Sequence, residues 1–251
     1  MVTVVLQNAN IEVINTKRGK FLLSSDMNEA KKRINRNQYR PDILHQCLLI
    51  LLDSPLNKSG QLEILIELTT KKIIKLNKSI RIPRVYNRFN GLFVQLLERH
   101  RIYSEESRIE LMKVEKEGIE YFISNDSIKI GLSQEGENFY EIIKKNNTEY
   151  NTYSTVNNDN STINNRHSVI SNNNNTMCNK LYNDNNTEYN THSVISNTKI
   201  PPYVFYINAI SSGDDPNKGM DYILSLSSYG LSAATCCSKI CTYFEEVLNI
   251  F

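Results

Sequence analysis

The sequence lacks most of the motifs that mark common enzyme active sites. It has no tryptophan and four histidines, and two of these, His167 and His192, lie in an asparagine-rich stretch. There is no HExxH, GxSxG or P-loop motif, and no GxGxxG follows an expected strand. These absences disfavour a metalloprotease, a serine hydrolase or a common nucleotide-binding enzyme. The chain instead suits a reaction that depends on binding and orientation, with the reactive group on a cofactor.

Cysteines and long apolar runs are also scarce. The five cysteines form no CxxC pair and their number is odd, which argues against a disulfide framework. Cys237 and Cys241 could share a helix face as metal ligands, but no histidine lies near them, and core packing is the favoured interpretation. The longest apolar run, residues 43–52, is too short to span a bilayer. With no signal-peptide pattern at the start, the sequence predicts an intracellular protein without a membrane partner.

Apolar periodicity predicts alternating strands and helices, and therefore an α/β fold. Residues 17–38 are polar and basic, which indicates a surface helix or loop. A helix should begin at Pro41 and end before Pro55, with His45 as a hydrogen-bonded structural residue rather than a general base. Strands are predicted at Val2–Leu6, Ile11–Ile14 (after a turn at Gln7–Asn10), Leu62–Leu68, Lys72–Leu76, Ile109–Val114, Tyr121–Ser124 and Ser127–Ile130, with Gly131 and Gly136 breaking the last.

Residues 146–198 differ in composition from the rest of the chain. Of these 53 residues, 18 are asparagine, and both NNTEYNT and HSVISN occur twice. Low hydrophobicity and internal repetition are typical of a disordered segment. We therefore expect one domain, residues 1–251, that carries residues 146–198 as an insertion.

The C-terminal stretch predicts a ligand site. The order is a strand at Tyr203–Ile210, a glycine-containing loop at Ser211–Gly219, a strand at Tyr222–Leu226, a turn at Ser227–Gly230 and a helix from Leu231. The apolar stripe of that helix is Leu231, Ala234, Cys237, Cys241, Phe244 and Leu248. Ligands of open α/β sheets bind outside the carboxyl ends of the strands, where such loops lie. This pattern predicts a site without naming its ligand.

Arginines gather in the segment SIRIPRVYNRFNG. Arg81, Arg84 and Arg88 are expected on a loop that leads into an amphipathic helix, and from Arg40 to Arg101 the chain has eleven Lys/Arg against five Asp/Glu. Each guanidinium offers a planar fork that matches phosphate oxygens. Surface ion pairs explain the same residues, and the composition favours neither interpretation.

Three long motifs carry a resemblance to a known family. RPDILHQCLLILLDSPLNKSG, RIPRVYNRFNGLFVQLL and LSLSSYGLSAATCCSKICTYFEEV closely resemble the pseudouridine N1-specific methyltransferases of small-subunit ribosomal RNA, which are ribosome assembly factors of the SPOUT class. The resemblance covers nearly the whole chain outside the insertion. It implies a SPOUT-type sheet with helices on both faces, a C-terminal trefoil knot and a homodimer.

The resemblance also implies the site residues. S-adenosylmethionine would be bound by Leu132, Asn208, Gly213, Leu226, Ser227, Ser228, Tyr229, Gly230 and Leu231. Ribosomal RNA would be contacted by Arg40, Arg81, Arg84 and Arg88, with Asp42 orienting a nearby arginine at the catalytic site. The family usually has glycine where this chain has Asn208 and often proline where it has Gly230.

The implied reaction is methyl transfer to ring nitrogen 1 of a pseudouridine in small-subunit ribosomal RNA. The alternative is an RNA-binding assembly factor whose methyl transfer is weak or dispensable, and a SPOUT enzyme for transfer RNA fits the motifs less well. The family implies a nucleolar protein that meets other small-subunit assembly factors.

Overall fold

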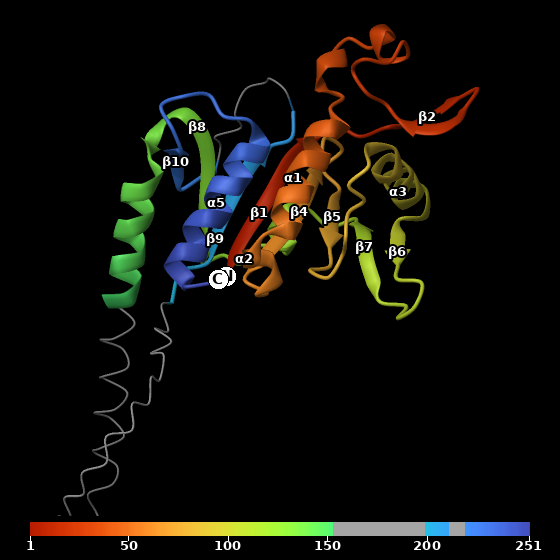
Figure 1. Ribbon diagram of the computed structural model, residues 1–251. Helices are drawn as coiled ribbons and strands as arrows, with labels where there is room; N and C mark the ends of the chain where they lie inside the picture. The colour runs from red at the N-terminus through yellow and green to blue at the C-terminus, as the bar shows by residue number, and fades with distance from the viewer. Residues whose placement is uncertain (153–198, 211–218) are drawn as a thin grey trace, which may run out of the picture.

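The computed structural model describes residues 1–152, 199–210 and 219–251 (Figure 1). The described residues form an eight-stranded sheet in the order β10-β8-β9-β1-β4-β5-β7-β6. The strands are β1 (Val2–Ala9), β4 (Leu62–Leu68), β5 (Ile73–Leu76), β6 (Arg101–Tyr103), β7 (Glu110–Glu115), β8 (Ile128–Asn138), β9 (Tyr203–Asn208) and β10 (Tyr222–Ser225). From β10 to β4 all neighbours are parallel, whereas β5, β7 and β6 continue the sheet antiparallel. The predicted α/β class is confirmed.

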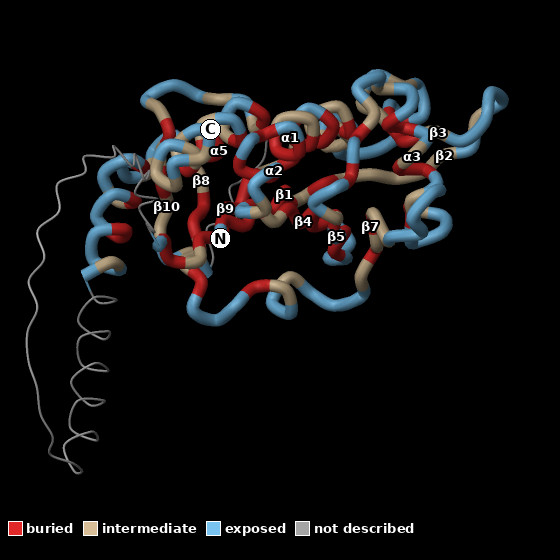
Figure 2. The backbone as a smooth tube through the Cα atoms, turned by 60° about the horizontal axis from the view of Figure 1, so that its bottom comes forward, coloured by how far each residue is buried: buried red, intermediate tan, exposed pale blue. Residues whose placement is uncertain are grey.

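The helices cover one face of this sheet (Figure 2). They are α1 (Pro41–Asp53), α2 (Pro55–Lys58), α3 (Tyr86–Arg99), α5 (Ala233–Leu248) and a helix over residues 139–152. Their apolar side chains join one core with alternate strand residues such as Val4, Ile64 and Phe205. Helices α1 and α5 lie side by side over the parallel half, where Cys47, Cys237 and Cys241 are buried. Core packing of these cysteines is therefore what the structure shows.

Two predictions are wrong for the opposite face of the sheet. We expected helices on both faces, but all α-helices of the described residues lie on the first face. The second face is covered by the loop segment 116–127, in which residues 119–121 form a short 3-10 helix instead of a strand at Tyr121–Ser124. Phe122 and Ile123 pack from this segment onto Val5, Leu65 and Val204. Their apolar pattern reflects packing onto the sheet, not membership of it.

Strand β8 runs through both glycines that were expected to end it. The reason lies in its pairing with β10. A Cβ at Gly136 would lie 2.6 Å from the Leu224 carbonyl carbon and 2.7 Å from the Ile223 carbonyl oxygen. Glycine is therefore needed for the close approach of two backbones, which is a recognised use of glycine within a strand.

The N-terminal region is also more structured than predicted. Strand β1 continues through the expected turn to Ala9, with a bulge at which Asn8 takes a left-handed φ of 57°. The next strand, β2 (Val13–Thr16), pairs with β3 (Gly19–Leu22) in a separate hairpin. One-turn 3-10 helices η1 (Ala30–Lys32) and η2 (Arg36–Gln38) follow, so this segment is neither one helix nor a plain loop.

The start of the expected insertion belongs to the fold. Residues 146–152 continue the helix that begins at residue 139, and the Tyr203 hydroxyl donates to Asn147 Oδ1 at 2.8 Å. Both Asn146 and Asn147 are buried. The rest of the expected insertion, residues 153–198, lies outside the described residues. Among the described helices, none combines the length and the apolar character that crossing a bilayer requires.

Candidate functional site

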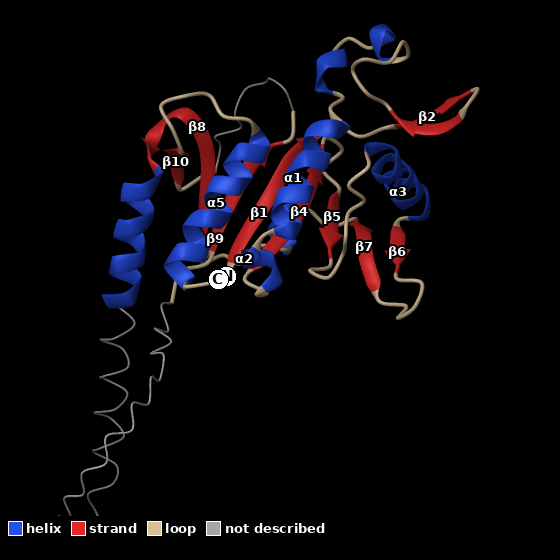
Figure 3. Ribbon diagram, in the orientation of Figure 1, coloured by secondary structure: helices blue, strands red, loops and turns tan. Residues whose placement is uncertain are grey.

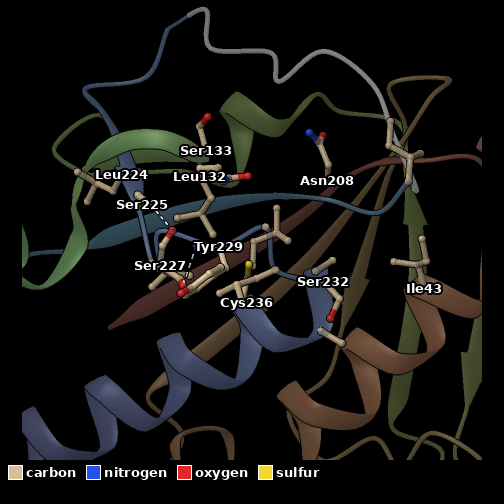
Figure 4. A pocket seen from close by; sticks show the side chains of 18 of the residues that line it. Ile43, Leu132, Ser133, Asn208, Leu224, Ser225, Ser227, Tyr229, Ser232 and Cys236 are labelled. Atoms are coloured by element: carbon tan, nitrogen blue, oxygen red, sulfur yellow. Dashed lines mark hydrogen bonds between the residues drawn. The ribbon is translucent and has the colours of Figure 1, made fainter.

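A cavity of about 480 Å³ lies where the carboxyl ends of the parallel strands meet the first turns of α1 and α5 (Figure 4). Strand ends, turns and helix starts all contribute to its wall. The lining residues are Arg40, Ile43, Gln46, Leu132, Ser133, Gln134, Ile207, Asn208, Ile210, Leu224, Ser225, Leu226, Ser227, Tyr229, Gly230, Leu231, Ser232, Ala233, Ala234 and Cys236. This is the edge of the sheet at which the sequence pattern predicted a ligand site.

Short hydrogen bonds fix the turn between β10 and α5. The Ser225 hydroxyl donates to the Ser227 carbonyl oxygen at 2.8 Å, and the Tyr229 N–H donates to the Ser227 hydroxyl at 3.1 Å. From β8, Gln134 Nε2 donates to the Ser228 carbonyl oxygen at 3.1 Å. The turn is therefore held both from within and from a neighbouring strand.

Helix α5 begins at the cavity wall. Ser232 is its N-cap, and the Ser232 hydroxyl accepts a hydrogen bond from the Thr235 N–H at 3.2 Å. The unpaired N–H groups of a helix start carry partial positive charge, which favours a negatively charged ligand group nearby. Cys236 lies one turn on, and burial raises the pKa of its thiol to about 11. This thiol stays protonated at neutral pH and is a weak nucleophile.

Asn208 ends β9 at the cavity. Its side-chain oxygen accepts a hydrogen bond from Asn8 Nδ2 at 2.8 Å, which ties the bulge of β1 to the end of β9. Figure 4 shows the Asn208 side chain to the right of Leu132 and Tyr229. The Asn208 side chain is thus held by a partner on the neighbouring strand.

Most of the expected cofactor residues converge here. Leu132, Asn208, Leu226, Ser227, Tyr229, Gly230 and Leu231 line the cavity. Ser228 does not line it, but its carbonyl oxygen binds Gln134. Gly213 lies outside the described residues.

Both helix starts contribute to the cavity wall, which the sequence patterns did not predict. Ile43 and Gln46 of α1, together with Ser232 to Ala234 of α5, complete the cavity wall. A serine directly before an apolar helix is an N-cap signal that could have identified Ser232. No local pattern predicts that α1 would meet it across the sheet.

Arg40 and Asp42 form a two-pronged ion pair at the start of α1. Arg40 Nη2 lies 2.7 Å from Asp42 Oδ2, and Arg40 Nε lies 2.9 Å from Asp42 Oδ1. Hydrogen bonding from Arg40 is the main cause that lowers the pKa of the Asp42 carboxyl. Asp42 itself does not line the cavity, whereas Arg40 does. Asp42 thus holds the guanidinium of the arginine that lines the cavity, and its role in catalysis stays a prediction.

Two of the other expected arginines lie at a second cavity of about 340 Å³, between α1 and the segment before α3. Arg81 and Arg84 line it, and Arg84 Nη2 lies 2.6 Å from Asp53 Oδ2. Arg88 is exposed in the first turn of α3, not on the loop before that helix. The structure thus keeps Arg81 and Arg84 together and places Arg40 at the other cavity.

His45 fixes the arginine-bearing segment to α1. Its Nε2 donates to the Pro83 carbonyl oxygen at 2.7 Å, and its ring stacks on Phe89 with centroids 4.3 Å apart. The ring is also buried. The prediction of a hydrogen-bonded structural histidine is confirmed, and its role is to position the residue directly before Arg84.

The fold and the cavity define a mixed α/β protein with a ligand site at the carboxyl ends of parallel strands. The profile of the EMG1/NEP1 methyltransferases matches residues 4–245. The ribosomal RNA small subunit methyltransferase NEP1 of Drosophila melanogaster is 30% identical over 250 residues, which cover 98% of this chain and 82% of that protein. The human protein of the same name is 28% identical over 250 residues, with the same coverage.

A solved structure agrees in fold. The crystal structure of Archaeoglobus fulgidus Nep1 bound to S-adenosylhomocysteine superposes with a TM-score of 0.65 at 20% identity, and covers 98% of each chain. The chain belongs to the EMG1/NEP1 methyltransferase family.

Proposed function

We propose that this protein uses S-adenosylmethionine to methylate ring nitrogen 1 of a pseudouridine in small-subunit ribosomal RNA during ribosome assembly. The observation that carries the proposal is the cavity at the strand ends, formed by the segments that match the family. The names of the relatives support ribosomal RNA as the substrate, and the ligand of the archaeal structure supports the cofactor.

The lining of the cavity fits this cofactor. Its volume is within the roughly 300–1,000 Å³ typical of small-molecule sites. Apolar side chains such as Leu132, Leu226 and Leu231 suit the flat face of an adenine. Backbone amides and carbonyls of the turn would hold the adenine and the methionine part, and the start of α5 would favour its carboxylate. When bound, the cofactor supplies a methyl group on a sulfonium, which is a good leaving group.

The chain's own task is orientation. In-line transfer requires the methyl group and the target nitrogen to be held close and collinear. A base within a helix cannot reach the cavity, so the target nucleotide must be looped out or flipped. Arg81, Arg84 and Arg88 would grip phosphates beside it and set the register.

Arg40 has a separate part in the proposed reaction. Among the described residues that line the cavity it is the only charged one, and neither a carboxylate nor an imidazole joins it there. A nearby cation favours the anionic form of an acidic group. Arg40, oriented by Asp42, would therefore favour loss of the proton from the target nitrogen, and we assign no side chain as general base.

Three further properties belong to this proposal: a trefoil knot, a homodimer and a nucleolar location with other assembly factors as partners. The strand order is compatible with a knot, because the chain passes from β8 to β9 and then back to β10 on the far side of β8; the family resemblance is what supports it. The family resemblance alone supports the other two.

The test is methyl transfer from labelled S-adenosylmethionine to two small-subunit RNA hairpins that differ only in uridine or pseudouridine at the loop. We expect label in the pseudouridine hairpin alone. Label in neither hairpin, with tight RNA binding retained, would support the alternative of an assembly factor with dispensable catalysis. Asn208→Gly would then show whether the asparagine at the cavity wall limits cofactor binding.

A further inference from the structure

Residues 17–40, which we call the basic arm, project from the body of the protein (Figure 1). The arm runs from the tip of the β2–β3 hairpin through η1 and η2 to the start of α1. It contains eight lysines and arginines against two acidic residues. Apart from Arg40, these cations neither line one of the two cavities nor belong to the arginine-bearing segment around α3.

Most of this charge faces solvent without a partner. Within the described residues, Lys17, Arg18, Lys31, Lys32 and Arg36 are exposed and form no ion pair. Two other cations of the arm, Lys20 and Arg33, pair with Glu98 and Glu12. Clustered cations without counter-charges raise the local concentration of a polyanion.

The arm is held in place by its base. Leu22 and Leu23 are fully buried, and the Leu22 N–H donates to Asn90 Oδ1 of α3 at 3.2 Å. Burial, followed by the charges of Asp42 and Asp26, raises the pKa of the Tyr86 hydroxyl to about 12. A fixed array of charge loses less entropy on binding than a flexible tail would.

The position of the arm matters as much as its charge. It leads directly into Arg40, which lines the cavity, and its base rests on α3, whose first turn carries Arg88. Figure 1 shows it rising from the edge of the sheet at which β1 and β9 end. An RNA with one nucleotide in the cavity would therefore extend past this surface.

We propose that the basic arm is a second RNA-binding surface, which contacts backbone phosphates of the stem that flanks the target loop. The proposal rests on the RNA substrate of the proposed function and adds where the substrate extends. Phosphate contacts carry no sequence information, so the arm would contribute affinity and register rather than base choice.

The experiment uses the full chain and two hairpins with the same loop, one with a short stem and one with a long stem. The test variant is Lys31→Gln, Lys32→Gln, Arg36→Gln. A matched control is Lys116→Gln, Lys144→Gln, Lys145→Gln. It removes one exposed cation from the loop segment 116–127 and two from the helix over residues 139–152, at the other end of the molecule. A second control, Lys31→Arg, Lys32→Arg, Arg36→Lys, keeps the charge of the arm.

We expect the test variant to bind the long-stem hairpin roughly ten-fold more weakly at low salt, with a log–log salt slope smaller by about 2 to 3, since each lost phosphate contact lowers the slope by about 0.9. Binding of the short-stem hairpin, melting temperature and S-adenosylhomocysteine affinity should stay unchanged, and both controls should resemble the wild type. An unchanged slope for the long stem, or an equal loss in the Lys116 control, would overturn the proposal.

The outcomes also separate this proposal from the proposed function. If the wild type methylates the hairpin but the salt slope of RNA binding is unchanged in the variant, the proposal for the arm is wrong and the enzymatic proposal stands. If the salt slope is smaller in the variant but the wild type methylates neither hairpin, the arm is an RNA-binding surface and the enzymatic proposal is wrong.

Discussion

The two cavities described above, both formed by described residues, differ in the groups that line them. In the first, one of the twenty lining residues is charged, and the wall consists largely of backbone turns and helix starts. In the second, Asp53, Lys58, Arg81 and Arg84 account for four of nine lining residues, over a floor of leucine and isoleucine. The first should depend on backbone geometry, and the second on side-chain charge. Changes to backbone fit and changes to charge should therefore affect different ligands.

The largest effect is expected from Gly136→Ala. The added Cβ would lie under 3 Å from the backbone of Leu224 and Ile223, and would force β8 and β10 apart. Overpacking of this kind costs about 1–3 kcal/mol. We expect a lower free energy of unfolding in urea and loss of S-adenosylhomocysteine binding measured by calorimetry.

Gly91→Ala is the control for this change. Gly91 is exposed in α3 with open space around its Cβ position, and alanine there should stabilise the helix by up to about 1 kcal/mol. If Gly136→Ala were as stable as the wild type and bound the ligand equally well, the close approach of β8 and β10 would not shape the first cavity.

Arg81→Ala with Arg84→Ala should disturb the second cavity alone. Both side chains are exposed, so the fold should tolerate the change. Loss of two phosphate contacts should lower the salt slope of RNA binding by about 2. Filter binding across a salt series measures the slope, and calorimetry should show unchanged cofactor affinity.

The matched control for the arginine pair is Lys144→Ala with Lys145→Ala, on the helix at the opposite end of the molecule (Figure 3). An equal loss of slope in this control would mean that net charge, not the second cavity, governs RNA binding.

Gln134→Ala should act on the first cavity without disturbing the second. It removes the hydrogen bond to the Ser228 carbonyl oxygen, and an exposed bond of this type contributes about 0.5–1.5 kcal/mol. We expect up to about a ten-fold loss of S-adenosylhomocysteine affinity, with RNA binding unchanged and a melting temperature lower by a few degrees at most.

A double-mutant cycle sharpens this prediction. A Cβ at Gly230 would meet Gln134 Oε1 at 3.4 Å, so Gly230→Ala should be tolerated better when Gln134 is already alanine. If the effects of the two substitutions on S-adenosylhomocysteine affinity are additive, Gln134 and Gly230 are not coupled.

The smallest effect concerns the single charged group of the first cavity. Because the pKa of Asp42 is lowered in the folded protein, the ion pair with Arg40 stabilises the fold above the unfolded-state pKa of about 3.9. That contribution is lost as the pH falls through the lower folded-state pKa. Asp42→Asn should therefore cost about 0.2–1 kcal/mol near pH 6, since the pair is partly exposed.

Urea unfolding of the wild type and Asp42→Asn between pH 3 and 7 measures this difference. The two proteins should become more alike toward the acid end. A difference that stays constant over the whole range would contradict the ion-pair explanation.

Local patterns in the sequence sufficed for the elements whose cause is local. Pro41 and Pro55 mark the ends of α1, alternation marks β4, and the apolar stripe marks α5. The strand–loop–strand–helix order also placed the first cavity at the correct edge of the sheet. The identity of its ligand came from family resemblance, because backbone turns lined by leucine and serine leave no specific chemical signature.

The errors arose where distant segments meet. Gly136 resembles a strand breaker until the backbone of β10 lies against it. Phe122 and Ile123 are residue types that are common in strands, but they lie in a loop that packs onto the sheet. The lining by Ile43 and Gln46 depends on α1 and α5 lying side by side, which no window of sequence contains.

The central position of β1 has a consequence for how the chain folds. This strand pairs with β4 on one side and with β9 on the other, and its Asn8 binds Asn208, 200 positions away. Such long-range pairing slows folding, because the chain loses the entropy of loop closure before the stabilising contacts can form. The entropy of closing a loop grows only with the logarithm of its length, so the asparagine-rich stretch adds little to that cost. During synthesis, β1 is made long before β9 and therefore has only one of its two neighbours until β9 follows.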